Sequence, residues 1–414
     1  MKKILIFSVA YHPFVGGAEV AIKELTDRLA GFQFDLITLR FDKKLPKFER
    51  IGNVNVYRLG FGIDSPKMSD LIELPLSLNK YLFPFLAYRK AVKLHKKNQY
   101  DAVWSMMANY AGFAALFFKL RNQKVPYLLT LQEGDPIEYI KKRVGFLHPI
   151  FKKIFTKADV IQSISSYLAD FGRSMGFKGL IEIVPNGVDV SKFTKEYSSH
   201  ELIALKLELG KKCGSNPNSS EPGLLGVHED VFLITTSRLV PKNGIFDVVK
   251  SLEFLPKYVK FLILGDGPQM EEMKDYIETN NLEERVKLLG YVDQKEIPKY
   301  LKISDIFIRP SLSEGFGNSF IEAMAAGLPV IATPVGGIVD FVFDPVDNPD
   351  KPPTGIFCQV ENPKSIAESV KMILDDDELK RKIISNGLEL AKGKYDWNLL
   401  AKDMKDKVFN KLIK

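Results

Sequence analysis

The stretch from Arg309 to Gly337 reads RPSLSEGFGNSFIEAMAAGLPVIATPVGG and carries the clearest structural signal in the chain. A short strand ends where it begins, a glycine-containing loop follows, and a helix is predicted to begin near Asn318 or Ser319. Backbone N–H groups at such a helix start are unpaired, and the helix dipole favours negative charge there. The stretch therefore predicts a strand, loop and helix of an α/β domain, with a diphosphate as the ligand that suits its geometry.

Strand and helix patterns alternate on both sides of this stretch. Short β-branched runs occur in a first series at 3–10, 34–39, 54–59, 102–104, 127–131, 160–164 and 181–184. They occur in a second series at 231–236, 260–264, 286–289, 306–309, 330–332 and 356–357. Strands that alternate with helices form parallel sheets covered on both faces. The sequence thus predicts two Rossmann-like, doubly wound domains, 1–187 and 188–394, with turn-rich excursions at 211–223 and 344–355.

Composition limits the class of protein. The chain has 414 residues, 45% hydrophobic and 26% charged, which is typical of a globular protein with more than one core. Cys213 and Cys358 fit no metal spacing and no disulfide framework, so we expect a reducing, cytoplasmic setting. The apolar run at 4–10 is too short for a signal peptide of the usual kind, and no apolar stretch is long enough to span a membrane.

Candidate site residues lie in loops that follow predicted strands. Glu314 and Glu322 are eight residues apart, which places one before the helix and the other one turn inside it. Two solvated carboxylates are the alternative interpretation. Arg238 and Lys242 follow the first strand of the second domain, where two cations can clamp a diphosphate or can simply be solvated. Gly16 and Gly17 follow the first strand of the chain and permit close backbone approach to a ligand, or form an ordinary turn.

The same stretch closely resembles the E-x7-E motif of the retaining glycosyltransferase family 4, also called group 1, which has the GT-B fold. Further segments match the family in order and spacing: GGAE at 16–19, VPNGVD at 184–189, SRLV at 237–240, GDGP at 265–268 and GYV at 290–292. The resemblance implies two domains that face a central cleft, the first on the acceptor side and the second binding the donor. It also implies that a helix at 395–414 crosses back to the first domain.

The resemblance implies roles for individual residues. Glu314, Arg238 and Lys242 are expected to act in catalysis, Glu314 close to the donor sugar. Glu322 is expected to bind the ribose, and Tyr291 and Val292 the base. Gln132, Glu133 and Asn186 are expected on the acceptor side. The complete expected donor-binding set is Gly16, Gly17, Arg238, Lys242, Tyr291, Val292, Glu314, Gly315, Phe316, Gly317, Asn318, Ser319 and Glu322.

Two positions depart from the family pattern. Many members place a lysine directly before a glycine where this chain reads Lys242-Asn243-Gly244. Gln132 stands where a histidine is common, and because glutamine cannot exchange protons, histidine-based roles do not transfer. The five histidines form no visible cluster, so we expect no metal and no cofactor besides the donor substrate.

The resulting functional prediction is a metal-independent, retaining hexosyltransferase. It would move a hexose from a UDP- or GDP-sugar to a glycan or lipid-linked acceptor in the synthesis of cell-surface glycans, and the donor's own phosphate would accept the acceptor proton. The alternatives are a non-catalytic sugar-nucleotide-binding protein and a GT-B-fold epimerase. A dinucleotide dehydrogenase is disfavoured because the loop after the first strand lacks the G-x-G-x-x-G turn.

Charge is distributed unevenly, which suggests an anionic partner. The net charge is +7, and residues 80–97 carry six basic and no acidic side chains, while 136–160 carry six basic and two acidic. Apolar residues recur at helical spacing in the second segment, so it predicts either peripheral contact with an anionic membrane, on the cytoplasmic face, or a core-facing helix with solvated lysines. Nucleic acid is not expected, because no recognition motif accompanies the charge.

Overall fold

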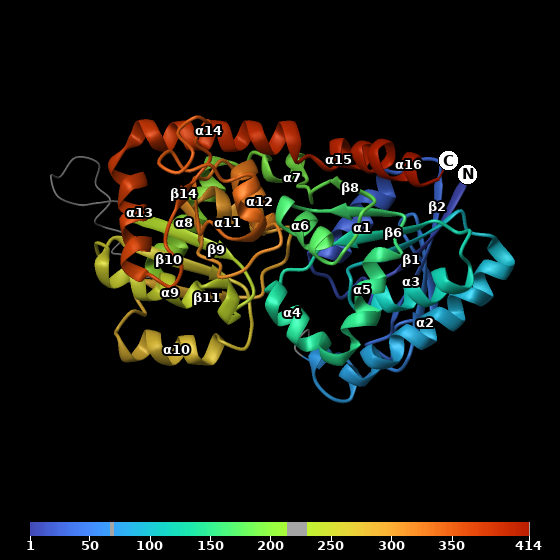
Figure 1. Cartoon of the computed structure of the whole chain (residues 1–414). Helices are drawn as coiled ribbons and strands as arrows, with labels where there is room; N and C mark the ends of the chain where they lie inside the picture. Colours follow the sequence, from blue (N-terminus) through green and yellow to red (C-terminus); the bar gives the residue numbers. More distant parts are fainter. Residues whose placement is uncertain (67–69, 213–229, 414) are drawn as a thin grey trace. The chain divides into compact units, whose positions relative to one another are not determined.

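The computed structural model describes residues 1–66, 70–212 and 230–413, which form two compact units (Figure 1). The first unit contains Met1–Gly187 and Trp397–Lys414, and the second contains Val188–Asp396. Each unit is a wholly or mainly parallel sheet with helices, which confirms the predicted α/β class. The turn-rich segment predicted at 211–223 falls, from residue 213 onward, outside the described residues.

The first unit contains an eight-stranded sheet with the order β3-β4-β2-β1-β5-β6-β7-β8. Its strands are β1 (Lys2–Phe7), β2 (Phe32–Leu39), β3 (Phe48–Ile51), β4 (Val54–Leu59), β5 (Ala102–Met106), β6 (Tyr127–Leu131), β7 (Val160–Ser163) and β8 (Leu180–Ile183). Its helices, apart from the C-terminal segment, are α1 (Gly17–Arg28), α2 (Leu76–Asn98), α3 (Tyr110–Arg121), α4 (Ile137–Val144), α5 (His148–Thr156) and α6 (Ser166–Ser174), with short turns η1 (Asp70–Ile72) and η2 (Gly145–Leu147). Neighbouring strands are parallel except the edge pair β3 and β4. Ile4 to Phe7 are fully buried, as expected for a central strand covered on both faces.

The second unit contains a six-stranded, all-parallel sheet with the order β11-β10-β9-β12-β13-β14. Its strands are β9 (Val231–Thr236), β10 (Val259–Leu264), β11 (Val286–Gly290), β12 (Ile306–Arg309), β13 (Val330–Ala332) and β14 (Ile356–Phe357). Its helices are α7 (Val190–Phe193), α8 (Ser199–Lys212), α9 (Ile245–Ser251), α10 (Met270–Thr279), α11 (Ile297–Lys302), α12 (Asn318–Ala326), α13 (Pro363–Asp375) and α14 (Asp377–Lys394), with short turns η4 (Pro241–Asn243), η5 (Leu252–Phe254) and η6 (Gly336–Asp340).

The strand order of the second sheet reverses between β9 and β12. From β9 the chain adds β10 and β11 on one side, and it then adds β13 and β14 beyond β12 on the other. In open parallel sheets the loops at the carboxyl ends of the strands separate at such a reversal and leave a crevice where ligands bind. The loops that carry Arg238 and Glu314 follow these two strands, so the topology places both at the reversal.

The C-terminal segment packs in the first unit. It consists of α15 (Trp397–Asp403), the π-helical turn η7 (Met404–Phe409) and α16 (Asn410–Leu412), and both termini lie beside the same sheet (Figure 1). Its buried side chains, among them Trp397, Met404 and Phe409, belong to the core cluster that contains Trp104. The expected start at residue 395 is two residues early, because the Tyr395 ring packs against Phe316, 5.5 Å between centroids, in the second unit.

We predict that Phe409→Ala destabilises the first unit by about 3–5 kcal/mol, because it leaves a large cavity in the core. The Phe409 ring lies 5.2 Å from that of Phe32 and 5.6 Å from that of Trp104. Trp104 and Trp397 are the two tryptophans of the chain, and both lie in the first unit, so tryptophan fluorescence reports its unfolding alone. Leu399→Ala is the matched control, since Leu399 is 45% exposed on the same segment. An equal effect of both changes would contradict the prediction.

No helix among residues 1–66, 70–212 and 230–413 has the length and apolar character needed to cross a bilayer.

Candidate active site

The loops after β9 and β12 are joined by their backbones. The Leu312 N–H donates to the Lys242 carbonyl at 2.7 Å, which connects the loop that carries Lys242 to the loop that carries Glu314. Gly244, with φ +67°, packs so closely on the second loop that a Cβ there would lie 2.0 Å from the Pro310 carbonyl oxygen. Only glycine fits this contact. The two loops therefore form one preformed structure at the reversal of the sheet.

Arg309, the last residue of β12, organises the predicted acidic motif. Its Nη2 donates to Glu314 Oε2 at 2.6 Å and its Nη1 donates to Ser319 Oγ at 2.9 Å. The guanidinium also lies over the Phe320 ring, 4.8 Å from the centroid. Arg309 is 7% exposed, and its Nε is buried without a hydrogen-bond partner among the described residues. Sequence reasoning missed this residue, although a cation that ends an apolar strand was a usable signal.

The backbone of Glu314 is held as firmly as its side chain. Its carbonyl accepts from the Gly337 N–H at 3.1 Å, and Gly336, with φ +55°, packs against it so that a Cβ would lie 1.8 Å from the oxygen. Its Oε1 accepts from the Gly315 N–H at 3.2 Å. The predicted donor group of Gly315 is therefore engaged by Glu314 itself in this structure.

Glu322 lies in α12, one turn beyond its start, with its side chain only partly exposed. Burial raises the pKa of its carboxyl to about 7, and the positive charges of Lys192 and Arg309 oppose that rise. The carboxylate is thus placed where its charge is poorly solvated and only partly compensated. Such a group suits the acceptance of hydrogen bonds from ligand hydroxyls, and its perturbed pKa marks it as a functional candidate.

Arg238 and Lys242 differ in their surroundings. The Arg238 side chain is exposed, and the Lys242 side chain is partly exposed on η4. Asn243 is buried, and its Nδ2 donates at 2.8 Å both to Ser237 Oγ and to the Arg238 carbonyl. The asparagine that departs from the family pattern therefore supports the backbone of the loop that carries Arg238.

The start of α12 has no side-chain cap, because Gly317 occupies the capping position. The Phe316 side chain is buried and packs on Phe341, so this residue can offer only its backbone to a ligand. The Ser319 hydroxyl is already bonded to Arg309. An uncapped helix start with a nearby cation is a suitable anion site.

Tyr291 and Val292 follow β11, two strands away from β9 at the same edge of the sheet. Tyr291 is 80% exposed and Val292 partly exposed, and Gly290 before them has φ +66°. A tyrosine exposed to this degree is available for contact with a flat ligand group.

In the first unit, Gly16 caps α1 and Gly17 is its first residue, as predicted for the loop after β1. The Gly16 N–H donates to Glu19 Oε2 at 2.7 Å, which supports a structural role for Glu19 at the helix start.

The residues expected on the acceptor side, Gln132, Glu133 and Asn186, connect the loops that follow β5, β6 and β8. Gln132 and Asn186 exchange side-chain hydrogen bonds, with Gln132 Nε2 donating at 3.0 Å to Asn186 Oδ1. Glu133 is buried, and its Oε1 accepts from the Ala108 N–H at 2.6 Å while its Oε2 lacks a hydrogen-bond partner among the described residues. Burial raises the pKa of Glu133 to about 7. The three residues lie together at the carboxyl edge of the first sheet, as their assignment to one region requires.

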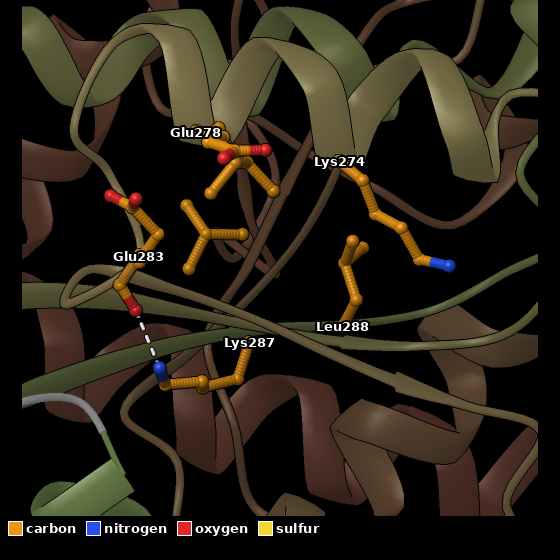
Figure 2. Close-up of a pocket in the computed structure, with 7 residues that line it drawn as sticks. Lys274, Glu278, Glu283, Lys287 and Leu288 are labelled. Atoms are coloured by element: carbon orange, nitrogen blue, oxygen red, sulfur yellow. Dashed lines mark hydrogen bonds between the residues drawn. The ribbon is translucent and has the colours of Figure 1, made fainter.

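A separate pocket of about 380 Å³ lies between α10 and β11 (Figure 2). Lys274 and Glu278 extend from the helix, and Glu283 and Lys287 border it near the strand, where the Lys287 side chain bonds the Glu283 backbone. Its lining includes none of the predicted donor residues. In the part of the chain that the structure describes, no group of three or more His, Cys, Asp or Glu is arranged to hold a metal ion.

Two family models match the chain, one over its first half and one over its second half. The model described as glycosyl transferases group 1 matches residues 222–390, and the model described as glycosyltransferase family 4 matches residues 15–192. The chain belongs to the group 1 glycosyltransferases of family 4. It is therefore a hexosyltransferase, and the E-x7-E motif described above is the one by which it resembles this family.

This glycosyltransferase is similar to known proteins over almost its whole length. It is 25% identical to the GDP-mannose-dependent alpha-(1-6)-phosphatidylinositol monomannoside mannosyltransferase of Mycobacterium tuberculosis, over 98% of each chain. Among solved structures it is similar to the sucrose-phosphate synthase of Thermosynechococcus elongatus, with a TM-score of 0.76, 23% identity and coverage of 100% and 99%. It is also similar to Anabaena HepE in complex with UDP-glucose, with a TM-score of 0.75, 19% identity and coverage of 99% and 100%. These structures confirm the GT-B fold.

Proposed function

We propose that this glycosyltransferase transfers a hexose, with retention and without a metal, from a nucleotide diphosphate sugar bound by the second unit. Glu322 binds the ribose hydroxyls, and Glu314 lies close to the sugar. Arg238, Lys242 and the start of α12 stabilise the departing diphosphate. The donor's own phosphate accepts the proton of the attacking hydroxyl, so no protein nucleophile takes part.

One observation carries the proposal: two carboxylates with cations beside them lie in the loop and helix that follow β12, next to the loop that carries Arg238. Arg309 is bonded to Glu314, and it and Lys192 act on the charge of Glu322, while Arg238 is exposed on the neighbouring loop. A negatively charged diphosphate and a polar sugar together match this mixture of charges. The UDP-glucose bound to HepE and the GDP-mannose named for the mycobacterial relative are donors of this class.

The acceptor is proposed to be a lipid-linked sugar or a glycan that grows at the cytoplasmic face of a membrane. The mycobacterial relative is named for phosphatidylinositol monomannoside, a lipid-linked sugar. The first unit has exposed apolar side chains on α2 and its approach and on the α4–α5 region, which we call the apolar face. It consists of Leu74, Leu78, Tyr81, Leu82, Phe85, Tyr139, Phe146, Leu147 and Ile150. Exposed apolar groups beside lysines favour contact with an anionic membrane.

A panel of nucleotides tests the donor half of this proposal. UDP, GDP and ADP, and then their sugars, are compared for the rise in melting temperature of the second unit. A ligand at about 100 times its Kd stabilises the folded state by about 2.7 kcal/mol, so the matching nucleotide stands out clearly. Its sugar should then be hydrolysed slowly with no divalent ion present. If no nucleotide stabilises the protein, the proposed donor site is wrong.

A further inference from the structure

Two cations of the first unit lie close together, and neither has an acidic partner among the residues that the structure describes. Lys80 belongs to α2 and Arg143 to the last turn of α4, and burial together with the charge of Arg143 lowers the pKa of Lys80. Neither forms an ion pair with any residue within 1–66, 70–212 or 230–413. By contrast, Lys141 on the same helix is paired with Glu138 at 3.2 Å. Lys80 is partly exposed and Arg143 is exposed, so both are open to an anion, and like charges brought together destabilise a protein unless an anion joins them.

Tyrosine hydroxyls complete the surroundings of these cations. Arg143 Nη2 donates to the Tyr110 hydroxyl at 3.4 Å, and the Tyr110 ring meets that of Tyr81 edge to face at 5.5 Å. Tyr110 is the first residue of α3, so the positive end of that helix dipole adds to the two charges. Three helices, α2, α3 and α4, thus contribute hydrogen-bond donors or positive charge to one place.

This cluster lies within the apolar face. Tyr81 is 61% exposed, and Phe85, one turn further along α2, is 59% exposed. On the other side, Gly145 ends α4 with φ +53°, and the next residue, Phe146, is 92% exposed. The cations are therefore bordered by side chains that gain free energy on entering lipid.

We propose that Lys80, Arg143 and Tyr110 bind the phosphate group of a membrane lipid while the surrounding apolar side chains enter its acyl region. The inference rests on the membrane contact in the proposed function and adds a specific headgroup site to it. A phosphate offers several acceptor oxygens, which match a guanidinium, an ammonium and a phenol at once. The apolar border selects a lipid phosphate over a soluble one, because only a lipid covers Tyr81, Phe85 and Phe146 as well.

Vesicle co-sedimentation with matched variants tests the site. Phosphatidylglycerol is mixed into phosphatidylcholine in rising proportion, and Lys80→Met, Arg143→Met and Lys142→Met are compared with the unmodified protein. Lys142 is exposed and precedes Arg143 on the same helix, so it controls for loss of one surface charge. We expect the Lys142 change to weaken binding about fivefold, as for a diffuse surface lysine. The other two should weaken it about tenfold or more, as for the loss of a hydrogen bond to a charged group.

Two further measurements distinguish a lipid phosphate site from diffuse charge and from a site for soluble phosphate. Tyr110→Phe removes only a hydroxyl and should weaken binding to phosphatidylglycerol vesicles without changing the melting temperature. Inorganic phosphate should not raise the melting temperature or displace the protein from vesicles. Equal losses for Lys80, Arg143 and Lys142 would mean that charge acts diffusely, and strong competition by inorganic phosphate would mean a soluble ligand; either result overturns the proposal.

The nucleotide panel keeps this test separate from the proposed function. Lys80→Met and Arg143→Met should retain stabilisation by the matching nucleotide, because the donor residues lie in the second unit. Nucleotide stabilisation without specific vesicle binding would overturn the headgroup site alone. Specific vesicle binding without nucleotide stabilisation would overturn the donor assignment alone.

Discussion

Glu322→Ala and Arg238→Ala are each expected to lower the rate of sugar transfer by about 10²–10³-fold, as for the loss of one electrostatic contact in a preorganised site. The Arg238 side chain is exposed, and Glu322 lies partly exposed in α12, so neither change should unfold the protein. Lys274→Ala, in the pocket away from the predicted donor residues, is the control and should leave the rate unchanged. Near-normal turnover by either purified, folded variant would contradict the site assignment.

The Glu322→Gln variant separates a functional role from a structural one. The folded-state pKa of Glu322, about 7, lies above its ordinary value of 4.5. The proton therefore favours the folded state, and the stability that this group contributes is present below about pH 4.5 and is lost as the pH rises through about 7. At about pH 8 the glutamine variant should be more stable than the unmodified protein by up to about 3 kcal/mol, and yet inactive. A variant that is destabilised at that pH would indicate a structural glutamate.

Much of the fold could be predicted from the sequence because buried parallel strands are continuous apolar runs. Both series of strands were recognised in this way, and the GT-B fold is confirmed. The strand β3, Phe48–Ile51, was missed because it is a short antiparallel edge strand whose residues are all at least partly exposed. An alternating pattern over only four residues cannot be distinguished, in the sequence, from a polar loop.

Helical spacing of apolar residues predicted the structure of the basic segment 136–160 less well. The apolar residues between 146 and 155 suggested one amphipathic helix, whereas Gly145 ends α4 and a new helix, α5, begins at His148. Phe151, Ile154 and Phe155 are buried, while Phe146, Leu147 and Ile150 are exposed. One part of the stripe is therefore core, as the core-facing interpretation requires, and the other part lies at the surface. Periodicity alone could not locate the break.

The candidate site was predicted as a set of loops, but its internal contacts were not. Glu314 and Glu322 follow from their spacing, and their environments depend on Arg309, which the strand pattern assigned to the sheet. In the sequence, Asn243 only departs from the family pattern, in which many members have a lysine directly before the glycine. Its two hydrogen bonds instead connect it to the Arg238 loop, which only three-dimensional packing reveals.

Arg309→Met is expected to destabilise the second unit by about 3–5 kcal/mol, because it leaves the Glu314 carboxylate without its cation in a largely buried place. Methionine keeps the apolar length that packs on Phe320. The double variant Arg309→Met/Glu314→Gln removes the charge as well as its partner, so we expect it to recover most of the lost stability. Thermal or urea unfolding followed by circular dichroism measures both effects.

Activity distinguishes positioning by Arg309 from mere stabilisation. If Arg309 holds Glu314 beside the sugar, the Arg309→Met variant stays slow in transfer even under conditions in which it is fully folded, whereas a purely structural arginine predicts near-normal transfer by the folded protein. Loss of the Arg309 charge also removes one of the two cations that oppose the raised pKa of Glu322. The pH below which donor binding weakens should therefore move upward in Arg309→Met, while Arg309→Lys, which keeps the charge, should show a smaller shift. Donor affinity measured across the pH range tests this shift. A change in folding stability alone would not move the pH at which donor binding is half lost.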